Sequence, residues 1–271
     1  MRANDTTSDR FLKGLTLGGP LGRGGMSRIR EAASADGRRF AVKFPDLDGR
    51  AGRAASRALL HREFGYLSEI SQPNVVKAFG LVRVPDGRDE LASGLGMVME
   101  YLDGGDLVSL AGGPPRIWVP VAARIVRAVD HLHRSGIVHR DLKPRNILMR
   151  SGGMPCLIDF AMAARIGGKA PTDGGTAAYL RRKPERYADA AEDIYALAVL
   201  VHELWAGDLP FGRFPRLAHG ERRRGFPALR PVPGMRGLSV VAEVVTDILN
   251  ERDAALSKGV GPLRHALESV G

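Results

Sequence analysis

The sequence predicts an α+β protein with a small, strand-rich first part that holds one helix, and a larger, mainly helical second part. Between Leu17 and Phe44, two or three short apolar runs separated by glycine turns indicate strands. Residues 53–70 place apolar side chains at helical spacing, which predicts the single helix of the first part. The pattern becomes helical after residues 100–105, so we expect the two parts to join there.

Two further strands complete the predicted first part. Short apolar runs at 75–84 and 96–101 indicate these strands, and the composition of 85–89 predicts a turn between them. In the second part, 119–133 is an amphipathic helix, which we expect to open at Pro120 near its first turn.

The segment 194–205 is apolar nearly all round, which predicts a buried helix. Its apolar run is interrupted by His202 and Glu203, and no stretch of about 18 apolar residues predicts a membrane span.

The 271 residues are 44% apolar and 26% charged, which is the composition of an ordinary soluble protein, and we expect it to be cytoplasmic. Cys156 is the single cysteine, which excludes an internal disulfide framework and fits a reducing compartment. The N-terminal residues lack the apolar core of a secretory signal. Secretion as an effector by a route without such a signal stays open, and no membrane partner is expected.

The formal net charge is +10, and lysine accounts for seven of the 40 basic residues, leaving 33 arginines. This charge fits either a surface for nucleic acid or another acidic partner, or a solvated arginine-rich face. No zinc-ligand spacing or other nucleic-acid-binding motif supports the first, so we expect no nucleic acid. Residues 213–236 hold seven arginines and one acid, which fits an acidic-substrate dock or, more simply, a solvated loop.

A glycine-rich segment predicts a phosphate loop. Gly22 and Gly24 lie in LGRGGMSRI, where a glycine hairpin would let backbone N–H groups approach phosphate oxygens. Two glycines alone are a weak signal, and Lys43 on an apparent strand strengthens it. Glu63 lies twenty residues further on, in the predicted helix. It is either a solvent-facing residue or an ion-pair partner that aims Lys43, and the local sequence leaves both open.

The strongest motif is IVHRDLKPRNIL at 137–148. Asp141 can accept a hydroxyl proton, Lys143 can lie near a transferred phosphate, and Asn146 can offer an amide oxygen to a metal. Asp159 follows at the end of an apolar strand and is a suitable Mg²⁺ ligand. Loop capping could explain any one of these residues, but hardly the whole ordered set.

Taken together, the motifs between Leu17 and Phe211 resemble those of the eukaryotic-type serine/threonine protein kinase family, in the form also found in bacteria. The resemblance implies a bilobal kinase fold with a flexible lead-in at 1–16. An antiparallel-sheet N-lobe would occupy 17–101 and a helical C-lobe 102–271. It also implies transfer of the γ-phosphate of ATP to Ser/Thr hydroxyls of protein substrates, with Mg²⁺, or Mn²⁺ as an alternative.

The resemblance assigns a role to each matched position. The ATP contacts would be Gly22, Gly24, Ser27, Ile29, Ala41, Lys43, Met99, Glu100, Leu102, Asp106 and Leu148. The catalytic set would be Asp141 as base, Lys143, Lys43, Glu63 and Thr176, and the metal ligands Asn146 and Asp159. By the same resemblance, Lys143 would mark serine/threonine rather than tyrosine specificity. Asp193 would brace the catalytic loop, and Leu67, His139 and Phe160 would be stacked core residues.

Two departures affect the glycine positions of the family. Ser27 replaces the usual third glycine of the phosphate loop, a mild change. Ala161 replaces the glycine of the Asp-Phe-Gly motif, which narrows the backbone choices there, so we expect a stiffer motif that keeps its metal ligand.

Two more departures concern a buried ion pair of the family. Lys183 stands where a glutamate is usual, with Glu185 two residues late, and Ser257 stands where its arginine partner is expected. Arg252 is a poor substitute by spacing. The hypothesis is that this pair was lost as a unit, the less damaging way to lose one.

Arg140 precedes Asp141, and in the family such an arginine often binds a phosphate on the activation loop. Thr172 is the only hydroxyl between Asp159 and Thr176, so it is the predicted autophosphorylation site. A short loop that is ordered without phosphate is the alternative.

An active protein kinase is the leading hypothesis for function. A pseudokinase or binding module is the second, favoured slightly by Ala161 and Lys183 and opposed by the intact catalytic set. A kinase of a small molecule is the third, and those relatives usually lack a lysine at the position of Lys143.

Overall fold

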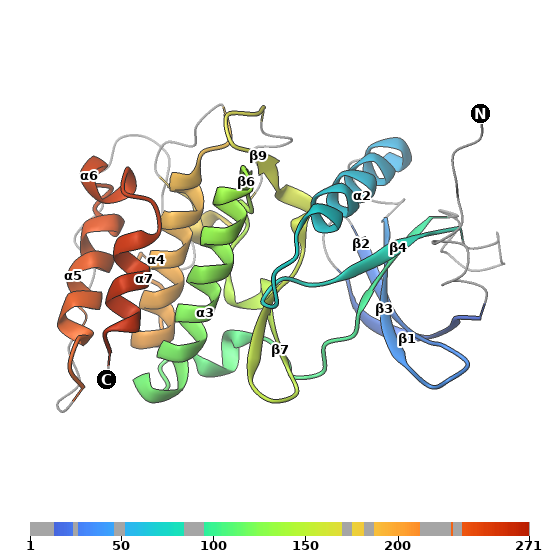
Figure 1. Ribbon diagram of the computed structural model, residues 1–271, viewed down its shortest axis with the longest axis horizontal. Helices are drawn as coiled ribbons and strands as arrows, with labels where there is room; N and C mark the ends of the chain where they lie inside the picture. The colour runs from blue at the N-terminus through green and yellow to red at the C-terminus, as the bar shows by residue number, and fades with distance from the viewer. Residues whose placement is uncertain are drawn as a thin grey trace. The chain divides into compact units, whose positions relative to one another are not determined.

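The computed structural model describes residues 14–23, 27–45, 52–83, 95–169, 175–181, 187–211, 229 and 235–270. The chain divides into two units. The first comprises the described residues up to Ser71 together with Val76–Asp103, and the second comprises Gln72–Val75 and the chain from Gly104 onward. The predicted α+β class is confirmed: a five-stranded antiparallel sheet with a helix forms the first unit, and the second is mainly helical (Figure 1).

The sheet of the first unit has the strand order β1-β2-β3-β5-β4, with all neighbours antiparallel. Its strands are β1 Thr16–Arg23, β2 Ser27–Ala33, β3 Arg39–Pro45, β4 Ala78–Val82 and β5 Gly96–Glu100. One face carries the apolar core of Ala32, Phe40, Val42, Phe44, Val82 and Val98. Alternation along β3 sends Ala41 and Lys43 to the other face.

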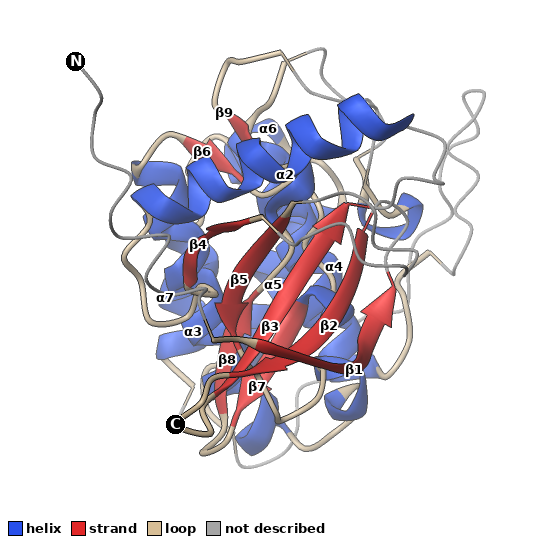
Figure 2. Cartoon of the chain, turned by 90° about the vertical axis from the view of Figure 1, so that its right-hand side faces the viewer, coloured by secondary structure: helices blue, strands red, loops and turns tan. Residues whose placement is uncertain are grey.

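The predicted helix of the first part is α2, Gly52–Glu69, which packs against β3, β4 and β5 (Figure 2). Its buried residues recur at helical spacing: Ser56, Leu60, Glu63 and Leu67. Two of these four residues are polar, so the buried face of α2 combines polar and apolar side chains. That explains its weak amphipathic pattern, and it means that a buried glutamate needs a partner there.

Helices dominate the second unit, where α3, α4, α5 and α7 lie side by side (Figure 1). They are α3 Pro115–Arg134, α4 Ala190–Ala206, α5 Leu238–Leu249, the short α6 Asp253–Leu256 and α7 Gly261–Glu268. Two small antiparallel pairs complete it: β6 Ile137–Val138 with β9 Ala164–Arg165, and β7 Ile147–Arg150 with β8 Met154–Leu157. None of the described helices is long and apolar enough to cross a bilayer.

The expected start of the first long helix was wrong. Helix α3 begins at Pro115, which occupies its first turn, while Pro120 lies inside the helix. A proline has no N–H to donate, so it fits the first turn best, and Pro120 costs one intrahelical hydrogen bond. The buried side of α3 includes Trp118, which packs against Trp205 of α4 with ring centroids 5.7 Å apart.

The predicted buried helix is α4, which carries twelve buried residues, Asp193 and His202 among them. It begins with a capping box between Asp189 and Glu192 and ends at Gly207, whose φ of 78° suits glycine.

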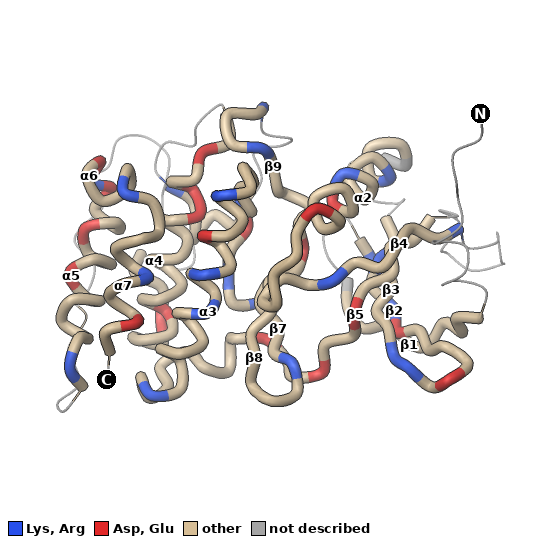
Figure 3. The backbone as a smooth tube through the Cα atoms, viewed as in Figure 1, with Lys and Arg blue, Asp and Glu red and all other residues tan. Residues whose placement is uncertain are grey.

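Charged residues of both signs are interspersed along the helices of the second unit (Figure 3). Two ion pairs fasten α7 to α3: Arg127 to Glu268 at 2.8 Å and Arg264 to Asp130 at 2.6 Å. Most of the arginine-rich segment 213–236 lies outside the described residues, so neither interpretation of it is tested.

Candidate active site

A buried ion pair joins the sheet and the helix of the first unit. Lys43 Nζ on β3 lies 2.7 Å from Glu63 Oε1 on α2, and the side chains are only 4% and 1% exposed. The buried face of α2 carries Glu63 toward the sheet, where Lys43 is its partner. Of the two readings that the sequence left open, the ion pair is therefore the one that the structure shows.

The predicted ATP-contact residues of the sheet share the face that carries Lys43. Strand register pairs Ile29 with Lys43 and Ala41 with Met99, and paired residues of antiparallel strands point to the same side. This face is opposite the apolar core of Phe40 and its neighbours. The sheet thus presents one lysine among Ile29, Ala41 and Met99.

The other predicted ATP contacts are spread over both units. Gly22 is exposed on β1, and Ser27 begins β2. Glu100 Oε1 accepts a hydrogen bond from Lys77 N at 2.8 Å, so its carboxylate joins β5 to the segment before β4. Leu102 is partly buried beyond β5.

In the second unit, Asp106 accepts a hydrogen bond from Val108 N at 3.1 Å and caps the 3₁₀ turn Leu107–Leu110. Asp106 also forms an isolated β-bridge with Leu148 of β7. The backbone of 104–106 is therefore fastened to β7, which fixes Leu148 beside it.

Four polar side chains meet in the second unit. Lys143 Nζ lies 2.7 Å from Asp141 Oδ2 and 2.8 Å from Thr176 Oγ1, and the Thr176 hydroxyl donates to Asp141 Oδ1 at 2.9 Å. Asn146 Nδ2 donates to both the carbonyl oxygen and Oδ2 of Asp141 at 2.8 Å. Every one of these contacts involves Asp141 or Lys143, so we call the four residues the Asp141 cluster.

Asp193 of α4 holds the backbone immediately before Asp141. Its two carboxylate oxygens accept hydrogen bonds from His139 N and Arg140 N, both at 2.8 Å, and His133 Nε2 lies 3.0 Å away. Asp193 is fully buried, and burial alone would raise its pKa. The hydrogen bond and charge of His133, with the amide of His139, outweigh burial and lower the pKa of Asp193.

The segment after Asp141 brings Asn146 beside the chain that leads to Asp159. Ile158 N donates to the carbonyl oxygen of Asn146 at 2.9 Å. Asp159 has a left-handed backbone (φ 63°, ψ 75°) and precedes the 3₁₀ turn Phe160–Met162, which contains Ala161. An alanine can adopt the backbone conformation of a 3₁₀ turn, so Ala161 can replace the usual glycine here without backbone strain.

His139 and Phe160 form an edge-to-face pair with ring centroids 4.7 Å apart, and both are fully buried in the second unit. Leu67, the third expected stacking residue, is buried in the first unit.

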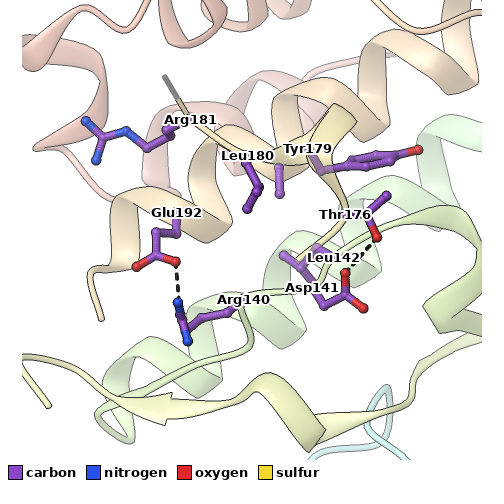
Figure 4. Close-up of a pocket in the computed structure, with 9 residues that line it drawn as sticks. Arg140, Asp141, Leu142, Thr176, Tyr179, Leu180, Arg181 and Glu192 are labelled. Carbon is purple, nitrogen blue, oxygen red and sulfur yellow. Dashed lines mark hydrogen bonds and ion pairs between the residues drawn. The ribbon is translucent and has the colours of Figure 1, made fainter. Parts of the chain in front are cut away.

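Two carboxylate contacts near the Asp141 cluster were not foreseen in the sequence. Arg140 Nε lies 3.0 Å from Glu192 Oε2, and the Tyr179 hydroxyl donates to Glu203 Oε2. Figure 4 shows the Arg140–Glu192 pair and the Thr176–Asp141 bond lining one pocket. For Glu192 a signal existed, because Asp189 and Glu192 have the spacing of a capping box. That pattern predicts the helix start, but says nothing of Arg140.

Several expectations fall on residues outside those described: Gly24, Thr172, Lys183 and Glu185. Arg252 is described and pairs with Asp247 of α5 at 2.6 Å. Ser257 directly follows α6. The hypothesis of a jointly lost ion pair stays untested.

The fold and the buried Lys43–Glu63 pair are those of a protein kinase domain. A family model described as "Protein kinase domain" matches residues 15–224, more than half of the chain. The chain belongs to the protein kinase family.

Curated relatives agree with this assignment. The chain is 32% identical over 212 residues to CBL-interacting protein kinase 4 of Oryza sativa subsp. japonica, covering 72% of this chain and 45% of that protein. It is 31% identical to "Probable serine/threonine-protein kinase PknB" of Bifidobacterium longum, covering 72% and 30%. It is also 31% identical to the DNA damage-responsive serine/threonine-protein kinase RqkA of Deinococcus radiodurans, covering 70% and 29%. The chain thus spans less than half the length of these relatives.

Proposed function

We propose that this chain is an active serine/threonine protein kinase that transfers the γ-phosphate of ATP to hydroxyl groups of protein substrates. The observation that carries the proposal is the Asp141 cluster. An acid, a lysine, an amide and a hydroxyl converge within hydrogen-bond distance, in a family whose chemistry depends on positioning and electrostatics.

Each member of the cluster has a distinct task in this proposal. Asp141 accepts the proton of the substrate hydroxyl as its oxygen attacks the phosphorus atom. Lys143 stabilises negative charge on the transferred group. Thr176 orients the Asp141 carboxylate through Oδ1, while Lys143 and Asn146 hold Oδ2, so the base is fixed at both oxygens before substrate arrives.

The first unit contributes to nucleotide binding. Lys43 would hold the α- and β-phosphates, with Glu63 fixing the ammonium group. The adenine would lie on the sheet face of Ile29, Ala41 and Met99, with Glu100 to Leu102 offering backbone groups. Gly22 and Ser27 would cover the phosphates, with Gly24, and Asp106 and Leu148 would complete the contacts by resemblance to the family.

The donor set of the second unit fits Mg²⁺, with Mn²⁺ as an alternative. Asp159 offers a carboxylate and Asn146 an amide oxygen, because its amide nitrogen already donates to Asp141. Magnesium is commonly held by one or two protein oxygens together with substrate phosphates, so two ligands suffice. When bound, the ion neutralises charge on the ATP phosphates.

A labelled-ATP assay with Mg²⁺ tests the proposal. Wild type should label itself or a generic basic protein, and Asp141→Ala should reduce the rate by several orders of magnitude, about 1.4 kcal/mol of barrier for each factor of ten. If wild type labels neither, the proposal is wrong and a binding module is favoured. A product that carries label on a sugar or antibiotic but never on protein would instead indicate a small-molecule kinase.

A further inference from the structure

A carboxylate already holds the arginine that precedes the proposed base. Arg140 Nε lies 3.0 Å from Glu192 Oε2, and the two side chains are only 4% and 10% exposed. Both residues line the same pocket as Asp141 and Thr176 (Figure 4). A pair so shielded from water is screened far less by salt than a surface pair. The guanidinium of Arg140 therefore has a countercharge supplied by the fold itself.

Glu192 is fixed from a second direction. It is the third residue of α4, and its Oε1 accepts a hydrogen bond from Asp189 N at 3.2 Å, while Asp189 Oδ1 accepts one from Ala191 N at 3.2 Å. One carboxylate thus caps the helix with one oxygen and holds Arg140 with the other. A negative charge at a helix N-terminus is favourable, so this position suits a carboxylate side chain.

The next residue of α4, Asp193, holds the backbone of Arg140. Asp193 accepts hydrogen bonds from the backbone of His139 and Arg140, so consecutive acids hold the side chain and the amide of one arginine. Arg140 has a positive φ of 69°, a conformation that persists only where the surroundings enforce it. Asp141 is the next residue in the chain. The contacts that hold Arg140 therefore also fix the orientation of the Asp141 side chain.

Building on the proposed function, we propose that Glu192 is a positioning residue, and that because of it the kinase needs no phosphate on its activation loop for activity. In kinases that this chain resembles, the arginine before the base often receives a phosphate from the activation loop. Here Glu192 supplies that negative charge internally, through Arg140, and holds the loop that carries Asp141. The enzyme is therefore competent before any phosphorylation of its activation segment, including Thr172.

The first experiment needs no variant. Wild type is produced together with a protein phosphatase, and intact mass confirms that it carries no phosphate. Its initial rate on a generic basic protein is compared with that of fully autophosphorylated enzyme. We expect kcat values within about threefold of each other. An unphosphorylated enzyme that is inactive until it is phosphorylated overturns the inference and leaves the proposed function intact.

The second experiment changes the carboxylate. Glu192→Gln keeps an oxygen for the capping box and removes the charge that faces Arg140. We expect kcat of the unphosphorylated variant to fall by about tenfold or more with an unchanged KM for ATP, and to rise on autophosphorylation. Glu268→Gln, which removes the exposed partner of Arg127, is the matched control and should leave kcat unchanged.

An unchanged kcat in unphosphorylated Glu192→Gln also overturns the inference. If that variant does not fold, the comparison of the two wild-type forms decides. If neither wild-type form exceeds Asp141→Ala, the proposed function itself has failed, and this inference fails with it.

Discussion

Lys43 Nζ and Glu63 Oε1 lie 2.7 Å apart and are almost completely shielded from water. Removing one member of such a pair leaves a buried charge without its partner, whereas replacing both with apolar groups of similar size is often neutral. This asymmetry separates the contribution of the pair to the free energy of unfolding from the contribution to nucleotide binding that we propose for it.

Glu63→Ala should therefore destabilise the first unit by about 3–5 kcal/mol, because it leaves Lys43 charged and buried. The double variant Lys43→Met/Glu63→Leu should regain most of that stability and still lack activity, because it removes the cation that we propose to hold the ATP phosphates. Urea unfolding and a labelled-ATP assay measure the two effects. A double variant as unstable as Glu63→Ala would contradict the prediction.

Thr176 is the member of the Asp141 cluster contributed by a distant segment, and it touches both Asp141 and Lys143. Thr176→Val keeps the shape and removes the hydroxyl, so we expect kcat to fall by about 10–100-fold, or about 1.4–2.7 kcal/mol of barrier. Thr176→Ser keeps the hydroxyl and should retain most of the activity. A larger loss in Thr176→Ser than in Thr176→Val would show that the methyl packing matters and the hydrogen bonds do not.

These contacts also show what sequence reasoning can reach. Asp141, Lys143 and Asn146 lie within six residues, so their spacing alone predicts that they act together. Lys43 and Glu63 are twenty residues apart, and the weak amphipathic pattern of α2 could not say which way Glu63 points. The packing of α2 against the sheet determines that Glu63 points toward Lys43.

The remaining misses have similar physical causes. Arg140 and Glu192 are 52 residues apart, and many acids of the chain could have met that arginine equally well. The start of α3 was placed at Pro120, although Pro115 also satisfies the preference of proline for a first turn. Local propensity cannot choose between two such prolines, whereas in the structure Pro115 and Trp118 are both buried residues of the same helix.

Gly104 fastens the start of the second unit to β7. Its N–H donates to Met149 O at 2.9 Å, Met149 N donates to Gly105 O at 2.8 Å, and a Cβ at Gly104 would lie 2.6 Å from Met149 O. Gly104→Ala must push two hydrogen-bonded backbones apart, so we expect it to cost about 1–3 kcal/mol of stability. Thermal unfolding measures the change.

Gly65→Ala is the matched control for that substitution. Gly65 lies inside α2, and a Cβ there would meet nothing within 4 Å. Alanine in a helix interior should stabilise by about 0.5–1 kcal/mol. If both variants shift the unfolding midpoint in the same direction, the close approach at Met149 does not determine the effect.

The Tyr179–Glu203 hydrogen bond should make the free energy of unfolding depend on pH in the alkaline range. Burial, and then the hydrogen bond to Glu203, raise the pKa of Tyr179 above its ordinary value, so the folded state keeps this proton after the unfolded state has lost it. The stability that Tyr179 contributes is fully present below about pH 10 and is lost as pH rises further, by at most about 1.4 kcal/mol per pH unit.

Tyr179→Phe removes the titrating hydroxyl. At neutral pH we expect it to cost about 1–3 kcal/mol, because it leaves the partly buried Glu203 without its donor. The advantage of wild type over the variant should then shrink between about pH 10 and pH 11, since other tyrosines and lysines titrate in both proteins and cancel in the difference. Urea unfolding of wild type and Tyr179→Phe across this pH range measures the difference in their stability. Stability curves that run parallel would show that Tyr179 keeps an ordinary pKa and that its hydroxyl is not held by Glu203.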